Sequence, residues 1–292
     1  MTALFWSPRY ELDWGEHVFP IEKYRLVADR LRAAGLALTE PPPATDEELA
    51  LVHPPAYLAR LRELARTPEL GVVEFEVPVT ERVIESFVLA TGGTIAAARR
   101  ALEEGAAGNV SGGFHHAFAD RGEGFCLIND LAVAIRVLQR ERRIARAAVI
   151  DLDLHQGNGT ARIFARDPSV YTFSIHQEHN YPVKERSTWD IGLDDGTGDV
   201  EYLTHVRSAV PKILDEFRPD IVLYQAGADP YREDKLGALA LTIDGLAERD
   251  RIVTRECRAR RVPVAATLGG GYARRTEDVV AIHFNTLRIL AE

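Results

Sequence analysis

A strand-like apolar run that ends in alternating acidic and apolar residues carries the clearest chemistry in this sequence. Residues 147–150 (AAVI) are followed at 151–155 by Asp-Leu-Asp-Leu-His. Side chains two positions apart share one face of a strand, so Asp151, Asp153 and His155 begin on the same side. Three ionisable groups beside a buried run require a neutralising positive charge, and carboxylate and imidazole groups are suitable ligands for a divalent cation. The alternative is an edge strand with its polar face in water, but the intervening leucines predict that the opposite face is packed.

Three more segments place polar residues after a glycine-rich turn. They are Asn109–His116, which ends in two adjacent histidines, Asp220–Pro230, which contains Asp229, and Ala265–Tyr272, with three successive glycines. Each has an ordinary explanation: a surface histidine pair, a turn-initiating Asp before Pro, and a flexible strand-to-helix turn. Because ligands bind at the carboxyl ends of strands in open parallel sheets, we nevertheless expect these segments to meet.

Taken together, the four segments supply the parts of a hydrolytic metal site. Asp153, His155 and Asp229 make a three-ligand set with one open position, which is typical of catalytic zinc. The pair His115-His116 offers a base and an acid, and Tyr272 offers a hydrogen bond to an oxyanion.

The elements that must position these residues follow a rhythm of apolar strand, glycine-rich turn and amphipathic helix. Strands are predicted at Ala3–Trp6, Ala147–Leu152, Val170–Ile175, Asp220–Gln225 and Val262–Leu268, and their continuous apolar character suits a parallel sheet. Helices are predicted at Lys23–Ala34, Ala56–Ala65, Glu81–Glu104, Leu131–Arg142, Glu201–Phe217, Gly245–Arg260 and Glu277–Leu290. We therefore predict an α/β fold, a three-layer α/β/α sandwich with a mainly parallel central sheet, and one domain over residues 1–292.

Composition excludes several other classes of protein. The 292 residues carry a net charge of −9, which argues against nucleic-acid binding, and two cysteines, Cys126 and Cys257, cannot build a disulfide scaffold. The arginine-rich runs Arg140–Arg146 and Arg255–Arg261 are interpreted as solvated helix ends. No uncharged apolar run approaches the ~20 residues that span a bilayer, and residues 1–17 do not resemble a signal peptide, so we expect a cytoplasmic protein.

At this point the chain resembles the zinc-dependent histone deacetylase family of the arginase–deacetylase superfamily. The resemblance runs from about Trp6 to the last predicted helix, and it rests on Ser111–His116, Gly124–Cys126, Asp151–Gly159, Gly227–Asp229 and Gly269–Tyr272. The class IV branch is the most similar, because Thr91–Ile95, Asp120–Gly122 and His155–Gly159 also look like that branch.

The resemblance implies a role for each matching residue. Asp153, His155 and Asp229 would hold one zinc or ferrous ion. Asp151 would orient His115, Asn158 would face His116, and Tyr272 would point at the substrate carbonyl. Gly124 and Phe125 would line the channel for an acyl-lysine side chain, and Gly270 would allow close approach of the substrate. A structural potassium ion near the backbone carbonyls of Asp151, Asp153, His155, Ser174 and Ile175 is also implied.

Two departures from the family pattern matter. Many deacetylases have an Asp where this chain has Asn158, and a neutral amide stabilises an imidazolium less than a carboxylate does. We therefore hypothesise that His116 keeps a lowered pKa and is a better base than acid. The stretch His176–Val200 matches the family poorly before Gly196, and we expect it to form part of the rim that selects substrates.

The predicted substrate is an acylated lysine on a protein or peptide, with an acetyl or longer fatty acyl group, and the predicted assembly is a monomer or small homo-oligomer. An arginase-like enzyme with two metals is disfavoured because Gly157 stands where such enzymes need a carboxylate. An acetylpolyamine amidohydrolase and a non-catalytic acyl-group binder stay open. We interpret Cys126 as a packing residue and the remaining histidines as surface or core residues, with His53 near the entrance; these are His17, His53, His176, His179, His205 and His283.

Overall fold

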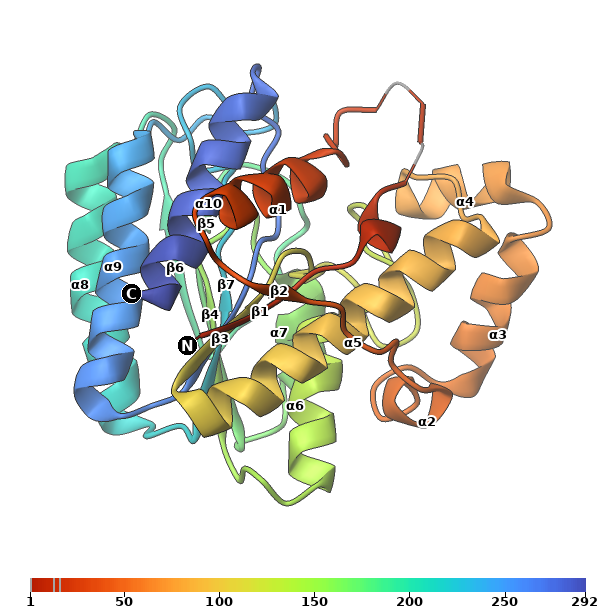
Figure 1. Cartoon of the computed structure of the whole chain (residues 1–292), viewed down its shortest axis with the longest axis horizontal. Coiled ribbons are helices and arrows are strands. Elements are labelled where there is room, and N and C mark those ends of the chain that lie inside the picture. Colours follow the sequence, from red (N-terminus) through yellow and green to blue (C-terminus); the bar gives the residue numbers. More distant parts are fainter. Residues whose placement is uncertain (1, 13, 16) are drawn as a thin grey trace.

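The centre of the molecule is a parallel sheet whose strands are mostly buried. The structure, a computed structural model, describes residues 2–12, 14–15 and 17–292. Within them, eight strands pair in the order β2-β1-β3-β8-β7-β4-β5-β6, and every pairing is parallel (Figure 1). The strands are β1 (Ala3–Phe5), β2 (Leu38–Thr39), β3 (Ala106–Asn109), β4 (Ala147–Asp151), β5 (Val170–Gln177), β6 (Trp189–Leu193), β7 (Ile221–Gln225) and β8 (Val264–Thr267). The predicted α/β class is therefore confirmed.

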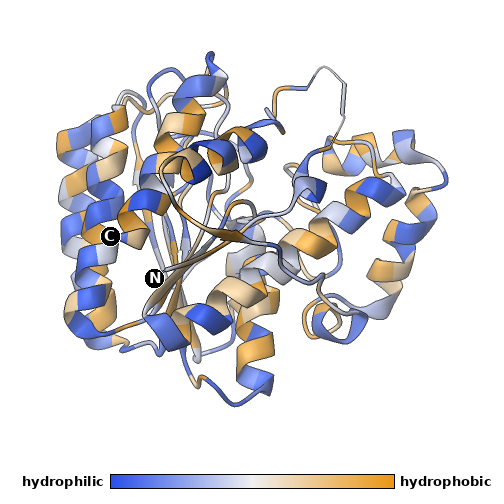
Figure 2. Cartoon of the chain, in the orientation of Figure 1, coloured by the Kyte–Doolittle hydropathy of each residue, from blue (hydrophilic) through white to orange (hydrophobic). Residues whose placement is uncertain are grey.

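Helices cover the sheet on both sides. The helical elements are η1 (Pro8–Tyr10), α1 (Lys23–Ala33), α2 (Asp46–Leu49), α3 (Pro55–Leu64), α4 (Pro68–Phe75), α5 (Glu81–Glu104), α6 (Asp130–Arg140), α7 (Asn158–Phe164), α8 (Asp199–Glu216), α9 (Ile243–Arg260) and α10 (Thr276–Ala291). One side of the sheet carries α8, α9, α10 and α1, each of which packs against the next in that spatial order (Figure 1). The other side carries α5, α6 and α7. The outer helices mix hydrophobic and hydrophilic residues, as expected for elements that face both the core and solvent (Figure 2). None of the described helices is long and apolar enough to cross a membrane.

The long predicted strands and helices are present, and the short elements were missed. All five predicted strands and all seven predicted helices occur, with ends shifted by a few residues. Strands β2, β3 and β6 and the helical elements η1, α2, α4 and α7 were not predicted; β2 has only two residues, and β3 consists of Ala, Gly and Asn. Thr45 and Glu48 form a capping box at the start of α2, and the Asn129 side chain caps α6.

A buried arginine joins the strands that lead into the candidate site. The Arg249 side chain on α9 is 0% exposed, and its Nη1 donates to the carbonyls of Leu152 (3.1 Å), just beyond β4, and Gly227 (2.6 Å), just beyond β7. Asp250 neutralises the guanidinium, with its Oδ1 2.9 Å from Arg249 Nε, and also accepts from the Tyr224 hydroxyl. This network ties α9 to two neighbouring strand ends.

Replacement of this arginine should therefore be costly. Arg249→Met leaves Asp250 buried without its cation, and we expect the free energy of unfolding to fall by about 3–5 kcal/mol. Urea unfolding of the metal-free protein measures the change. The control is Arg207→Met, which breaks an exposed ion pair with Glu248 and should cost less than ~1 kcal/mol. Equal losses in the two variants would contradict this account.

Candidate active site

The ends of β4 and β7 bring the three predicted metal ligands together. Asp153, His155 and Asp229 are all buried, and one ligand atom from each lies within 4.8 Å of the others. His155 Nδ1 lies 3.3 Å from Asp153 Oδ1 and 3.1 Å from Asp229 Oδ2. Strands β4 and β7 are direct neighbours, so residues 74 positions apart in the chain meet at one edge of the sheet.

The electrostatics of this cluster favour a bound cation. Burial alone would lower the pKa of His155, but hydrogen bonds and charges of the two aspartates outweigh burial and raise it to about 10. Burial and the neighbouring Asp153 carboxylate raise the pKa of Asp229 to about 6. Two carboxylates and one imidazole also fit the ligand preferences of zinc.

Backbone and amide donors orient the ligand carboxylates. Asp153 Oδ2 accepts from Gln225 Nε2 (2.8 Å) and from the Gly270 amide (2.9 Å), and Asp229 Oδ1 accepts from the Leu154 amide (2.9 Å). A Cβ at Gly270 would lie 2.1 Å from Asp229 Oδ2, so only glycine allows this approach. Gly270 thus contacts the ligand carboxylates, whereas the sequence led us to expect that it makes room for substrate.

The histidine pair is held by a turn with two glycines and by the start of α6. Gly112 and Gly113 have φ values of +76° and +82°, which glycine adopts most readily. The buried Asp130 carboxylate, at the first residue of α6, accepts from the amides of Gly113 (3.0 Å) and Phe114 (2.8 Å). This carboxylate fixes the backbone immediately before the two histidines, a role that the sequence did not suggest.

Each histidine has its own partner at Nδ1. His115 Nδ1 lies 2.7 Å from Asp151 Oδ2, and His116 Nδ1 lies 2.9 Å from Asn158 Oδ1, as the sequence predicted. Burial acts to lower the pKa of His115, but the charges of Asp151 and Asp153 raise it to about 9.

The pKa of His116 is well below its ordinary value. Burial is the main cause, followed by the charges of His115 and His155, while the hydrogen bond to Asn158 acts in the opposite direction. The direction agrees with our hypothesis, but the cause differs: the environment of the ring matters more than the amide.

Tyr272 and a buried lysine stand on the other side of the ligands. The Tyr272 amide donates to Asp234 Oδ2 (2.7 Å), and the Tyr272 ring lies edge-on to His155, with centroids 6.3 Å apart. Lys23 is 0% exposed and donates from Nζ to the Gly269 carbonyl (2.8 Å). Burial lowers the pKa of Lys23 to about 8, against the attraction of Asp229 and Asp153. Sequence reasoning missed Lys23 and Asp234, because neither lies in a recognisable motif.

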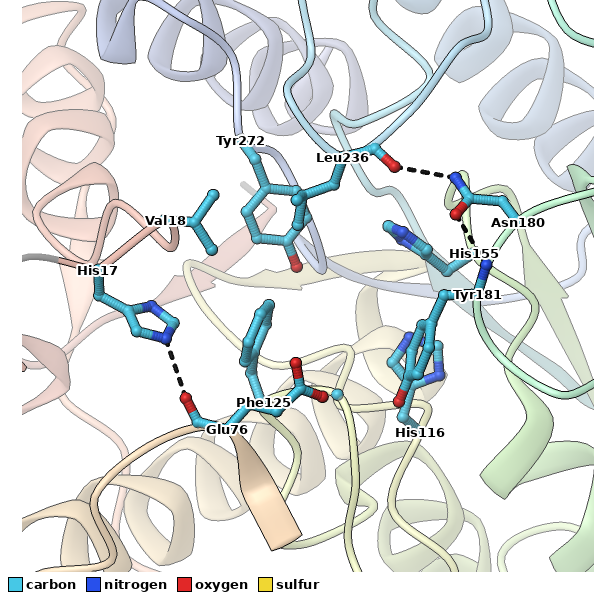
Figure 3. Close-up of a pocket in the computed structure, with 11 residues that line it drawn as sticks. His17, Val18, Glu76, His116, Phe125, His155, Asn180, Tyr181, Leu236 and Tyr272 are labelled. Atoms are coloured by element: carbon cyan, nitrogen blue, oxygen red, sulfur yellow. Dashed lines mark hydrogen bonds between the residues drawn. The ribbon is translucent and has the colours of Figure 1, made fainter. Parts of the chain in front are cut away.

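These groups open into a pocket of about 450 Å³ (Figure 3). It contains five of the predicted site residues, namely His116, Gly124, Phe125, His155 and Tyr272, and six that were not predicted, namely His17, Val18, Glu76, Asn180, Tyr181 and Leu236. Phe125 and Tyr181 stand on opposite sides of it (Figure 3), and the Tyr181 ring lies 5.2 Å from that of His116. The expected rim segment 176–200 thus contributes Asn180 and Tyr181, while its remainder includes β6.

Two histidines need correction. His17 was interpreted as an ordinary surface or core residue, but it lines the pocket, with Nε2 3.0 Å from the Glu76 carbonyl oxygen. His53 was placed near the entrance, but it is fully buried, with Nδ1 3.0 Å from the Ala119 carbonyl oxygen. A single histidine outside any motif carries no signal that could have separated these two cases.

Metal binding at this site should release protons. Because the pKa of His155 is about 10, its ring holds a proton near neutral pH that must leave before Nδ1 binds a cation. We expect about one proton released per zinc ion at about pH 7.5, and an affinity that rises about tenfold per pH unit from about pH 7 to 8. Calorimetry in buffers of different ionisation enthalpy, with chelator competition, measures both. His205→Ala, on α8, should behave like the parent protein, and zinc binding without proton release would contradict the expectation.

Comparisons with known proteins agree with the geometry. Residues 17–287 match the model of the histone deacetylase domain. The chain is 42% identical to an uncharacterised protein of Picosynechococcus sp., in an alignment that covers 92% of this chain and 91% of that protein. It is 34% identical to histone deacetylase 2 of Arabidopsis thaliana, in an alignment that covers 96% of this chain and 77% of that protein. It is similar in fold to the crystal structure of the HDA15 HD domain, with a TM-score of 0.82, 22% identity, and coverage of 99% of this chain and 91% of that chain. The chain belongs to the histone deacetylase family.

Proposed function

We propose that this member of the family is a metal-dependent hydrolase that removes acetyl or longer acyl groups from the side-chain amine of lysine in proteins or peptides. The observation that carries the proposal is that the cluster of Asp153, His155 and Asp229 opens, through His155, into a pocket that His116 and Tyr272 also line. Membership of the family supports amide hydrolysis.

We propose zinc as the resident ion, with ferrous iron as the alternative. His155 Nδ1 and one carboxylate oxygen each from Asp153 and Asp229 would hold it. When bound, such an ion polarises the substrate carbonyl and lowers the pKa of water to near neutrality. The two carboxylates and one imidazole leave a coordination position open for these ligands.

The chain's own groups would divide the proton transfers. His116 has a lowered pKa, so its ring is neutral at pH 7 and can accept a proton from water, then donate it to the leaving amine. His115, paired with Asp151, has a raised pKa and would remain cationic, which favours negative charge in the transition state. The Tyr272 hydroxyl points into the pocket and would donate a hydrogen bond to the oxyanion (Figure 3).

The walls of the pocket suit an extended aliphatic chain. Phe125, Tyr181 and Leu236 line it, and burial of methylene groups against such side chains stabilises binding by about 0.8 kcal/mol each. Four further points remain predictions from the sequence: the similarity to the class IV branch, the cytoplasmic location, the structural potassium ion and the assembly state.

Removal of the tyrosine hydroxyl tests the assigned chemistry. Tyr272→Phe should lower kcat about 10²–10³-fold, because one oxyanion donor is lost, while the zinc content stays that of the parent protein. Phe19→Leu, a change in a neighbouring ring that carries no donor, is the control for altered packing around Tyr272 and should retain most activity. Near-normal turnover by Tyr272→Phe would rule out this role.

The substrate is tested with a panel of acyl amines. Peptides with acetyl-, octanoyl- and myristoyl-lysine and an acetylated polyamine are incubated with zinc-loaded protein, and the released carboxylic acid is measured. The proposal predicts that at least one of the acyl-lysine peptides is hydrolysed and that the highest kcat/KM of the panel belongs to an acyl-lysine peptide. A preference for the polyamine would favour a small-molecule amidohydrolase, and binding without release of acid would identify a non-catalytic binder.

A further inference from the structure

A carboxylate that does not touch His116 is connected to it through one amide. Asn158 Oδ1 lies 2.9 Å from His116 Nδ1, and Asn158 Nδ2 donates to Glu123 Oε1 at 2.5 Å. The amide of Asn158 therefore stands between the imidazole and the carboxylate. Nothing in the roles derived above uses Glu123.

The hydrogen bonds that link His116, Asn158 and Glu123 allow only one arrangement of the hydrogen atoms. A carboxylate has no proton to donate, so the Asn158 side chain must turn its NH₂ group toward Glu123. Its oxygen then faces His116, and an amide oxygen can only accept. His116 must therefore carry its proton on Nδ1, which leaves the lone pair of Nε2 free.

We propose that Glu123 is a positioning residue that fixes the orientation of Asn158 and, through it, holds His116 in the tautomer whose Nε2 can accept a proton. The inference rests on the proposed function, in which His116 is the base. The negative charge of Glu123 thus lies one amide away from the imidazole of His116.

The local backbone holds Glu123 where this role requires it. Gly124 and Phe125 have φ values of +55° and +65°, so the chain turns sharply after Glu123, and the Cys126 amide closes the turn on the Glu123 carbonyl (3.0 Å). The Tyr181 hydroxyl lies beside the same carboxylate. On the other side, a Cβ at Gly159 would lie 2.4 Å from the Ala117 carbonyl oxygen, so the start of α7, which carries Asn158, packs directly on the histidine loop.

Glu123→Gln separates this role from a purely structural one. The variant keeps the shape and a hydrogen bond, but the glutamine amide can either accept from Asn158 or donate to it, so Asn158 can adopt both orientations. Nitrogen-15 NMR of the imidazole rings in the resting zinc protein should show only the Nδ1-H form of His116 in the parent and a mixture of tautomers in the variant. We expect kcat to fall several-fold, in proportion to the Nδ1-H fraction, with KM unchanged.

A reciprocal exchange provides the rescue. In Glu123→Gln combined with Asn158→Asp, the glutamine donates to the new carboxylate, which accepts from His116 Nδ1, so the single tautomer and most of kcat should return. Glu103→Gln, at the distant end of α5, is the matched control and should change neither quantity.

The proposal is overturned if Glu123→Gln retains the pure Nδ1-H form, or if the double variant fails to restore that form. Because the spectra are recorded without substrate, they decide the role of Glu123 even if the protein proves not to hydrolyse acyl amines.

Discussion

The rest of the site depends on the negative charge of the carboxylates that are buried at the ends of β4 and β7. Asp151, Asp153 and Asp229 are each no more than 2% exposed. A buried carboxylate is stable only when it is hydrogen-bonded and matched by positive charge. His115 matches Asp151 directly, whereas the other two aspartates share His155, with Lys23 as a further buried cation. We propose that a divalent ion, when bound, replaces the proton of His155 as the positive charge between Asp153 and Asp229, and the hydrolytic chemistry proposed above depends on that exchange.

The fold concentrates this charge at low conformational cost because the parallel sheet brings the strand ends into register. Arg249 holds the carbonyls that follow β4 and β7, and Asp130 fixes the loop before the histidines. Glycines at 227 and 270 allow backbone to approach the ligand carboxylates closely. The ligand side chains are therefore preorganised by the backbone and side-chain groups around them, as precise catalytic geometry requires.

The sequence predicted the parts of the site that lie in contiguous strings and missed those that tertiary packing creates. Continuous apolar runs identified the central strands, and alternation identified Asp151, Asp153 and His155 on one face. The short strand β3 lacks a hydrophobic pattern of its own because close packing requires small residues there: a Cβ at Gly108 would lie 2.7 Å from the Leu287 side chain. Glu123 reaches the site because its turn packs against Asn158, and no spacing in the sequence indicates that contact; for Tyr181 the sequence predicted only the rim segment 176–200 and not the residue itself.

Anomalous diffraction at the zinc absorption edge, from crystals grown with zinc, tests the central claim most directly. The account predicts one strong peak bonded to His155 Nδ1 and to one carboxylate oxygen each of Asp153 and Asp229. A position left open by the protein should face the pocket between Tyr272 and His116. Ordered crystals that show no peak at these three side chains, or zinc bound only elsewhere, would contradict it.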